Sequence, residues 1–554
     1  MATTGTREAT APAAVSSDRR KWLVLGAMVF GLFMPMLDNL VVNVALPTIQ
    51  DKLGAGVSGL QWIIDAYTLT FASFMLTGGA LGDLYGRKRF FMSGLGLFTL
   101  GSLMCGLSGS TGTLVAFRAV QGLGAAMLLP GSLSIITATF SGRERGAAIG
   151  IWAAMSGLAI AIGPVVGGLL VEHVSWQSIF YINVPIGIIG LTMTYLVVTE
   201  SKDPNTSRRI DPPGLITGTA GLFFLVYGLI ESNARGWGDP LILGAFAVAA
   251  VLLTLFFYVE SHRESPMLPL SFFRIPTFSA ANVVAAAVFF AMFGSVFFFS
   301  LYLQNIDHYS PVGAGVRLLA FSLVILIVAP LAGRFSDRFG SRWFMTVGPI
   351  VGAIGLALML RTEVGSAYIT IILPSFLVLA AGMATTMTPM TAAVMGSVPV
   401  RNAGVASAAT NTSREIGGVF GIALLGAIVT SVFKRGWQPA LQAVGIPKGV
   451  AANMVARYGT AAATGGAPNF QAFSKNIPRS IPLPVQRAIY TSIDHPFVHA
   501  MHAAIYVAVA FMLLAGVVSA IFVRSHVEPQ SALIASPNGE RASAPVEDAA
   551  VHGQ

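Results

Sequence analysis

Long apolar stretches separated by short polar segments run through almost the whole chain. Fourteen of these stretches are about 20 residues long or longer, the length that an α-helix needs to cross the hydrocarbon core of a bilayer. They lie near residues 22–46, 60–82, 90–109, 112–138, 145–171, 176–199, 212–231, 240–260, 277–306, 312–335, 343–361, 366–395, 403–432 and 499–523. The pattern predicts an all-α polytopic membrane protein with fourteen transmembrane helices.

Two of the polar turns between these stretches repeat one spacing of residues. Each turn has a Gly four positions before an Asp, a Gly three positions after it and a base five positions after it. The first copy holds Gly79, Asp83, Gly86 and Lys88, and the second holds Gly333, Asp337, Gly340 and Arg342. A polar turn repeated between long apolar runs indicates an internally duplicated membrane protein.

The distance between the two copies indicates how many helices separate them. Asp83 and Asp337 lie 254 residues apart, which is about eight spans at about 30 residues for each span with its loop. Transporters with two homologous six-helix halves place equivalent loops six spans apart. We therefore expect two inserted helices between the halves, and the stretches 212–231 and 240–260 are the natural candidates.

The predicted organisation is two six-helix bundles joined by the two inserted helices. Its segments are a disordered cytoplasmic N-terminus at 1–21, an N-terminal bundle at 22–199, the inserted helices with their linkers at 200–274, a C-terminal bundle at 275–523 that includes an extracytoplasmic loop at 434–498, and a disordered cytoplasmic tail at 524–554. The prolines of the 434–498 loop predict an irregular cap. Whether this cap gates the protein, binds a partner or only covers the mouth stays open.

Composition supports a membrane protein and excludes other classes. The chain is 54% hydrophobic and 10% charged, whereas soluble domains carry about 25% charged residues, so an ordinary globular enzyme is excluded. The bases concentrate in alternate loops, which places both termini in the cytoplasm. Because the net charge of +9 is spread over many short loops, we expect no nucleic-acid partner. The single cysteine, Cys105, cannot form an intrachain disulfide.

No cofactor is expected. The sequence has no Walker loop, so ATP is not expected as the energy source, and it has no evident nucleophile–base pair, so we predict a protein that is not an enzyme. His495, His499 and His502 share one face of a helix, with no carboxylate nearby beyond Asp494. We expect these histidines to lie at the membrane interface and not to bind a metal.

Charged residues interrupt the apolar stretches at a few positions. Asp38 lies inside the first span, and an ionisable group at membrane depth is costly and therefore functional by default, although a structural role stays an alternative. Asp65 in the second span is either a second proton or cation site or a solvated interfacial carboxylate. Arg118 cannot relay protons itself, so we expect it to stabilise the charged form of a neighbouring carboxylate. For Arg414-Glu415, a self-paired charge and a substrate role both stay open.

These segments together resemble the major facilitator superfamily, and specifically its fourteen-helix drug:proton antiporter branch. The resemblance covers nearly the whole chain. It rests on the turn at Asp83, the Leu37–Pro47 segment around Asp38, the helix-four segment beginning at Arg118, the Gly/Pro run from Gly157 to Gly168 and the Trp176–Gly187 segment. The chain departs from the branch where Leu40 replaces Thr, Leu84 replaces Arg and Gln177 replaces Arg. The Leu84 departure predicts a reduced charge network in the first copy of the turn.

The resemblance assigns roles to three groups of residues. Proton coupling and substrate binding fall to Asp38, Asp65, Arg118 and Glu415. A conformational latch that holds the outward-open state falls to Gly79, Asp83, Gly86, Arg87, Lys88, Asp337, Arg338 and Arg342, and Gly79 and Gly82 are expected to permit close helix approach. The antiporter motif of helix five consists of Gly157, Gly163, Pro164, Gly167 and Gly168, and it is expected to let helices two and five slide closely.

The function implied by the resemblance is proton-coupled export of amphipathic or hydrophobic drugs by alternating access, driven by the proton motive force. The expected partners are a small amphipathic substrate, protons and the lipid bilayer, and the expected form is a monomer in a bacterial cell membrane. An alternative is a dedicated exporter of one endogenous product, such as a lipid, a siderophore or a self-made antibiotic. An uptake permease and a non-transporting sensor or membrane enzyme are further alternatives.

Overall fold

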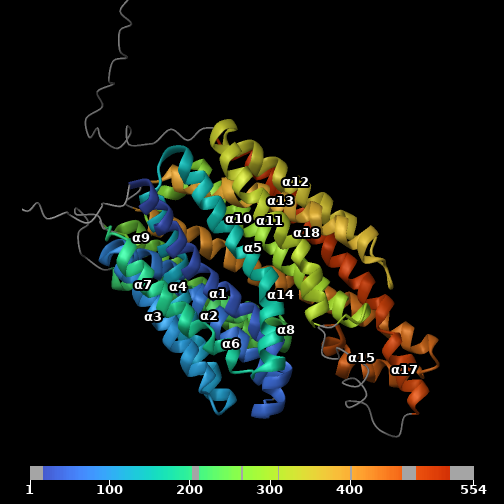
Figure 1. Ribbon diagram of the computed structural model, residues 1–554. Helices are drawn as coiled ribbons and strands as arrows, with labels where there is room; N and C mark the ends of the chain where they lie inside the picture. The colour runs from blue at the N-terminus through green and yellow to red at the C-terminus, as the bar shows by residue number, and fades with distance from the viewer. Residues whose placement is uncertain are drawn as a thin grey trace, which may run out of the picture.

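The structure is a computed structural model that describes residues 17–55, 57–201, 211–263, 266–309, 311–399, 402–463 and 482–524. All regular secondary structure in these residues is helical (Figure 1). The first part of the chain forms α1 (Ser17–Leu53), α2 (Val57–Tyr85), α3 (Arg87–Gly106), α4 (Thr111–Thr139), α5 (Gly142–His173), α6 (Ser178–Tyr181) and α7 (Asn183–Val197). The remainder forms α8 (Pro212–Arg235), α9 (Pro240–His262), η1 (Leu270–Arg274), α10 (Pro276–Leu301), η2 (Tyr302–Ile306), α11 (Pro311–Phe339), α12 (Ser341–Met359), η3 (Tyr368–Ile372), α13 (Leu373–Ser397), α14 (Ala403–Ala443), α15 (Lys448–Ala463), α17 (Leu483–Thr491) and α18 (Asp494–Phe522).

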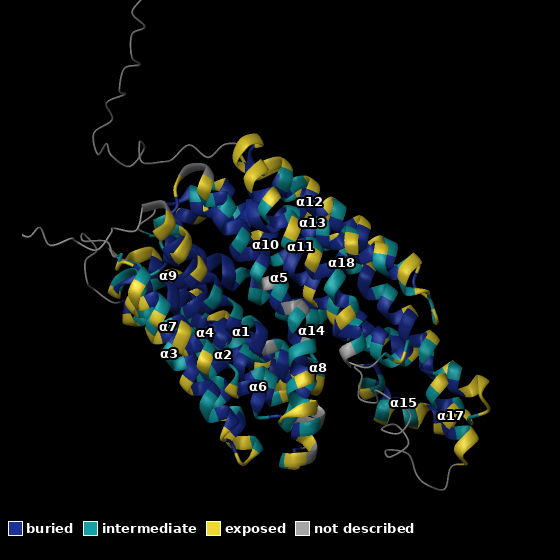
Figure 2. Cartoon of the chain, viewed as in Figure 1, coloured by how far each residue is buried: buried dark blue, intermediate teal, exposed yellow. Residues whose placement is uncertain are grey.

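The helices have the length and the surface of membrane spans. Eleven helical segments in the described part of the chain are long and apolar enough to cross a bilayer, and α2, α3 and α5 fall on the other three predicted spans. Large apolar side chains such as Tyr195, Val251 and Ile369 are exposed, which fits a surface that faces lipid. Figure 2 shows the buried residues gathered inside the bundle. The all-α polytopic fold is therefore confirmed, and the count of fourteen spans stays a prediction.

Helices α1–α7 and α10–α18 form two bundles whose internal packing repeats (Figure 1). In the first bundle, α1 packs on α5 and α7, α2 packs on α4, and α3 packs on α4 and α7. In the second bundle, α10 packs on α14 and α18, α11 packs on α13, and α12 packs on α13 and α18. Two seams join the bundles, one between α5 and α11 and one between α2 and α14. This one-for-one correspondence is what an internal duplication produces.

The two inserted helices form a hairpin beside the seam between α2 and α14. α8 packs on α9 and also on α2 and α14, whereas α9 packs mainly on α8. A 2.7 Å hydrogen bond joins the hydroxyls of Thr77 and Thr219, and the rings of Trp62 and Tyr227 lie 6.2 Å apart. α8 therefore covers this seam and is fastened to the N-terminal bundle.

The expectation of an irregular cap at 434–498 is wrong for its described residues. α14 continues to Ala443, and α15 and α17 follow as helices that project beyond the bundle in Figure 1; residues 464–481 lie outside the described ranges. Pro447, Pro482 and Pro484 lie at or just before helix starts, where proline's fixed φ and missing N–H favour a helix. These prolines therefore mark the beginnings of helices.

Gly79 allows the two bundles to meet at the α2–α14 seam. A Cβ atom added at Gly79 would clash with Ala408 and would lie 2.5 Å from the carbonyl oxygen of Gly404. A Cβ added at Gly82 would find only the Phe90 ring, at 3.5 Å. The predicted close approach therefore holds for Gly79 and is wrong for Gly82, because only Gly79 faces the other bundle.

We expect Gly79→Ala to force α2 and α14 apart, because neither backbone at this contact can yield as a side chain would. Spin labels on the exposed residues Tyr85 and Trp343, in a chain with the buried Cys105 replaced by Ser, report the separation of the bundles by electron paramagnetic resonance. The distance distribution should lengthen or broaden in Gly79→Ala and stay unchanged in the matched control Gly82→Ala. An unchanged distribution in Gly79→Ala contradicts the assignment.

Candidate functional site

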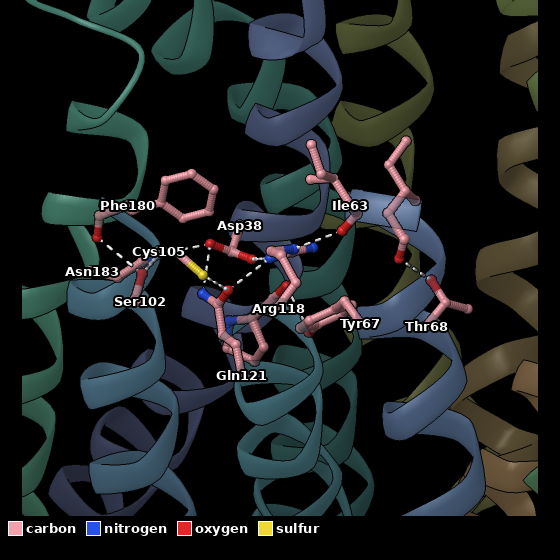
Figure 3. A network of polar contacts seen from close by, with 12 residues as sticks. Asp38, Ile63, Tyr67, Thr68, Ser102, Cys105, Arg118, Gln121, Phe180 and Asn183 are labelled. Carbon is pink, nitrogen blue, oxygen red and sulfur yellow. Dashed lines mark hydrogen bonds and ion pairs between the residues drawn. The ribbon is translucent and has the colours of Figure 1, made fainter. Parts of the chain in front are cut away.

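A fully buried carboxylate, that of Asp38, lies at the centre of the N-terminal bundle. Its side chain is 0% exposed on α1, and polar residues from α3, α4 and α7 converge on it (Figure 3). The surrounding donors are Arg118 and Gln121 on α4 and Asn183 at the start of α7. Four helices of the bundle thus meet at one charged group.

Both oxygens of the Asp38 carboxylate accept hydrogen bonds. Arg118 Nη1 donates to Oδ2 in a buried ion pair, and Gln121 Nε2 and Asn183 Nδ2 each donate to Oδ1 at 2.8 Å. A buried charge is tolerated only when it is paired and hydrogen-bonded in this way. The donors therefore allow Asp38 to carry a negative charge away from water.

Arg118 is held by the second helix as well as by Asp38. Its Nε donates to the carbonyl oxygen of Ile63 at 3.1 Å, and its guanidinium lies 4.3 Å from the ring centroid of Tyr67. The Tyr67 hydroxyl donates to the carbonyl oxygen of Pro35 at 3.3 Å. Arg118 Nη2 is buried without a hydrogen-bond partner, so the guanidinium keeps one unused donor.

Local sequence explains how these groups reach Asp38. Arg118 and Gln121 are three residues apart, so they share one face of α4, and Gln121 Oε1 accepts from Arg118 Nη1 at 2.7 Å. Asn183 follows the break between α6 and α7, and its Nδ2 also donates to Ser102 Oγ at 2.9 Å. Pro185 lies in the first turn of α7 and lacks the N–H that would continue the preceding helix. Asn183 thus lies in the first turn of α7 with its amide bonded to the carboxylate.

The other two predicted coupling residues lie outside this network. Asp65 interacts electrostatically with Glu231 of α8 and has a buried oxygen without a hydrogen-bond partner. Glu415 is half-buried on α14 and lies within electrostatic range of Tyr67. Asp65 thus faces an inserted helix, and Glu415 approaches the Asp38 network from the other bundle.

Asp83 links the two bundles through the end of a helix. Its Oδ2 accepts from the backbone N–H of Val405 at 2.9 Å, and its Oδ1 accepts from Arg87 Nε at 2.9 Å. A negative charge is favourable at a helix N-terminus, and Val405 lies in the first turn of α14. Asp83 therefore contacts a helix N-terminus of the other bundle and pairs with a base, Arg87, of its own bundle.

Asp337 occupies the equivalent position at the end of α11. A Cβ atom added at Gly146, near the start of α5, would clash with the Asp337 carboxylate, just as one added at Gly404 would clash with Asp83. Each carboxylate thus lies beside the first turns of a helix in the other bundle. Asp83 and Asp337 therefore occupy equivalent positions in the two bundles.

The two copies of the turn differ in charge, and the difference lies at Arg87 as well as at Leu84. In the first copy Arg87 forms an ion pair with Asp83, whereas Ser341 stands at the corresponding position of the second copy. Arg338 is exposed, and its guanidinium lies 5.4 Å from the ring of the adjacent Phe339. The described ion pair is therefore in the first copy.

The bases of the repeated turn fasten helices inside their own bundles. Lys88 Nζ donates to the carbonyl oxygen of Tyr195 at 2.8 Å, near the end of α7. Arg342 Nη2 donates to the carbonyl oxygen of Ala520 at 2.5 Å, near the end of α18. These two members of the predicted latch thus bond within one bundle and do not cross the seam.

The glycines of the repeated turn allow one helix to end and the next to begin at once. Gly86 has φ of +114° and Gly340 has φ of +86°, values that residues with a Cβ rarely adopt. Gly86 N donates to Gly82 O at 3.1 Å, and Gly340 N donates to Ser336 O at 2.8 Å. Both glycines therefore close the preceding helix and reverse the chain.

The helix-five motif packs on the first helix, and the expectation that it slides on the second is wrong. A Cβ atom added at Gly163 would lie 2.7 Å from Leu40 Cβ, and one added at Gly167 would lie 3.1 Å from Val41 Cα. The i, i+4 spacing puts both glycines on one face of α5, and that face meets α1 beside Asp38. Of the remaining motif residues, Gly168 is buried, and the surroundings of Gly157 and Pro164 are outside the description.

Sequence reasoning found Asp38 and Arg118 but missed most of their partners. Gln121 and Asn183 belong to recognised segments, yet neither received a role. Both side chains are neutral amides, so they lack the charge by which Asp38 and Arg118 are recognised inside apolar spans. For Gln121 the three-residue spacing from Arg118 was an available signal. Asn183 lies on a different helix, far along the chain from Asp38, so no local spacing relates the two residues.

We expect Arg118→Leu to lower the free energy of unfolding by about 3–5 kcal/mol, because it leaves a buried carboxylate without its counter-charge. The double variant Asp38→Leu/Arg118→Leu should be less destabilised than Arg118→Leu, since no unpaired charge remains. Chemical unfolding in detergent measures both. Lys21→Ala, which breaks the partly exposed 3.3 Å pair with Glu144, is the control, with an expected effect of about 0–1 kcal/mol. This account is contradicted if the double variant has a lower free energy of unfolding than Arg118→Leu.

The chain is similar to bacterial resistance and export proteins. It is 37% identical over 426 residues to "Multidrug resistance protein Stp" of Mycobacterium tuberculosis (strain CDC 1551 / Oshkosh), covering 77% of this chain and 79% of that protein. It is 35% identical over 454 residues to "Tetracenomycin C resistance and export protein" of Streptomyces glaucescens, covering 81% and 84%. Sequence similarity thus extends over most of both relatives.

Solved structures and family comparison agree with the duplicated fold. The crystal structure of the human organic anion transporter MFSD10 (TETRAN) matches with a TM-score of 0.58 and 11% identity, covering 91% of this chain and all of that one; this likeness concerns the fold alone. The sequence model of the Major Facilitator Superfamily matches residues 28–422 and, in a second match, residues 281–534. With the family match spanning most of the sequence and both bundles showing equivalent packing, the chain belongs to the Major Facilitator Superfamily.

Proposed function

We propose that the protein is a proton-coupled antiporter of a bacterial cell membrane that exports amphipathic and hydrophobic compounds by alternating access. The observation that carries this proposal is the Asp38 carboxylate, buried at 0% exposure and bonded to Arg118, Gln121 and Asn183. The names of the M. tuberculosis and S. glaucescens relatives support export of drugs. No cofactor is invoked, and a monomer embedded in lipid suffices.

The network gives a proton a defined effect. A proton on Asp38 removes the negative charge that neutralises Arg118, so the buried guanidinium must seek another acceptor or more solvent. Tyr67 stacks on Arg118 at 4.3 Å and lies within electrostatic range of Glu415 in the other bundle. In this proposal Tyr67 couples the change in charge at Asp38 and Arg118 to Glu415 on α14.

The latch supplies the conformational side of the cycle. In this proposal both termini and the Asp83 turn lie on the cytoplasmic side, as the distribution of bases favours, and the described contacts close the cytoplasmic end. The hydrogen bond from Val405 N to Asp83 crosses the seam and must break when that end opens. Proton uptake from outside and release inside would then exchange with substrate moving outward.

A dedicated exporter of one compound is the second candidate. The S. glaucescens relative is named for a single compound, tetracenomycin C, whereas the M. tuberculosis relative is named for multidrug resistance. Transport of a chemically diverse panel separates the two: export of several unrelated compounds favours the first candidate, and export of one favours the second.

We expect Asp38→Asn to lower uphill transport by at least about tenfold, which corresponds to about 1.4 kcal/mol, because the amide cannot carry a proton in exchange. The measurement is uptake of ethidium and other fluorescent amphipathic compounds into everted vesicles under an imposed pH gradient. Glu172→Gln, an exposed carboxylate on α5, is the matched control and should transport normally. If Asp38→Asn still concentrates these compounds like wild type, Asp38 is not the coupling group.

A further inference from the structure

A second buried arginine, Arg414, lies on α14 and lacks the counter-charge that Arg118 has. Its side chain is 4% exposed. In the part of the chain that the structure describes, no carboxylate oxygen lies within 4.0 Å of its guanidinium. A cation buried at membrane depth without a contacting anion is costly. Its presence at this position therefore calls for a compensating function.

The partners of Arg414 are neutral. Nη1 donates to Asn411 Oδ1 at 3.1 Å, Nη2 donates to Thr391 Oγ1, and the guanidinium lies 5.4 Å from the ring centroid of Phe289. Nε is buried without a hydrogen-bond partner. Arg118 has the same kinds of neighbour, an amide three residues away on its own helix and an aromatic ring, and additionally Asp38. The missing element at Arg414 is the carboxylate.

Glu415 does not fill this position. It acts electrostatically on Arg414 but makes no ion pair with it, and it also lies within electrostatic range of Tyr67 in the other bundle. Consecutive residues of a helix point about 100° apart, so the two side chains diverge. The charge of Arg414 is thus offset only at a distance, and Nε keeps its donor.

The surroundings of Arg414 favour an aromatic ligand. The rings of Phe289 and Phe293 lie 5.7 Å apart, and Phe293 packs against Gly418, one turn beyond Arg414 on α14. Phe293 is 37% exposed. α14 also packs on α2 and α4 of the other bundle, so this cation and aromatic pair lie on helices at the interface between the bundles.

We propose that Arg414 binds the carboxylate of amphipathic aromatic substrates, whose rings pack against Phe289 and Phe293. A guanidinium matches the planar geometry of a carboxylate and forms strong charge-assisted hydrogen bonds with it. The substrate then supplies the anion that the protein omits. This assignment rests on the proposed export function and names a substrate class for it.

The test compares pyrenebutyric acid with its methyl ester, which keeps the ring and removes the charge. Binding to the purified full-length chain in detergent is followed by pyrene fluorescence near neutral pH, without any gradient. Wild type should bind the acid at least about tenfold more tightly than the ester. Arg414→Gln should bind both equally, and Arg414→Lys should keep part of the preference, because an ammonium keeps the charge without the planar fork.

The control is Arg435→Gln on the exposed end of the same helix, where Arg435 Nη2 donates to Ser431 Oγ at 3.0 Å; it should behave as wild type. Equal binding of acid and ester by wild type, binding of neither, or a preference retained in Arg414→Gln overturns the proposal. Failure of export altogether is a separate result, because gradient-driven uptake of ethidium tests the proposed function without an acidic ligand.

Thermal unfolding excludes a merely structural role. If Arg414 serves only to hold the fold, Arg414→Gln should unfold at a lower temperature than wild type. If it is held unneutralised for a ligand, the same variant should unfold at an equal or higher temperature, and pyrenebutyric acid should raise the midpoint of wild type but not of the variant. Arg414→Lys provides the same comparison if the Gln variant does not fold.

Discussion

The structure of the N-terminal bundle depends on keeping one charge, that of Asp38, away from both water and lipid. Its two oxygens take three donors from α4 and α7, and Ser102 ties the same network to α3 and to the carbonyl oxygen of Phe180. An unsatisfied charge at this depth would cost several kcal/mol. The helices therefore have to meet at one point, and the Gly163–Gly167 face of α5 lets α1 lie close enough to bring Asp38 there.

Internal duplication explains the arrangement of the helices, and divergence between the two copies explains their different buried charges. Packing partners, the seams between bundles, the carboxylates at Asp83 and Asp337 and the bases that fasten the last helix of each bundle all occur in two equivalent copies. The buried charges do not. The N-terminal bundle holds a neutralised pair, and the C-terminal bundle holds Arg414 with neutral partners. The two bundles therefore share one frame but place different groups at their buried polar positions.

The inserted helices change the surroundings of this frame without entering it. α8 is bonded to α2 through Thr77 and Thr219 and also packs on α14, so it covers one seam between the bundles. Asp65 faces Glu231 of α8 instead of Asp38. A carboxylate that looks in sequence like a second coupling site thus lies within electrostatic range of a carboxylate of the insertion, which no motif in the span itself indicates.

The sequence by itself determined the helical stretches, the duplication and the insertion, and it singled out Asp38 and Arg118 as charges inside apolar spans. Apolar run length and charge at membrane depth are local properties, and the bilayer makes both costly to violate. Only the tertiary structure decided which side chains meet: that Gln121 and Asn183 complete the Asp38 site, that helix five packs on helix one, that Lys88 and Arg342 stay within their bundles, and that Arg414 and Glu415 do not pair. These facts depend on the rotation of each helix about its axis and on contacts between residues far apart in the chain. Spacing along one helix gives the face that a residue occupies, but it does not say which neighbour that face will meet.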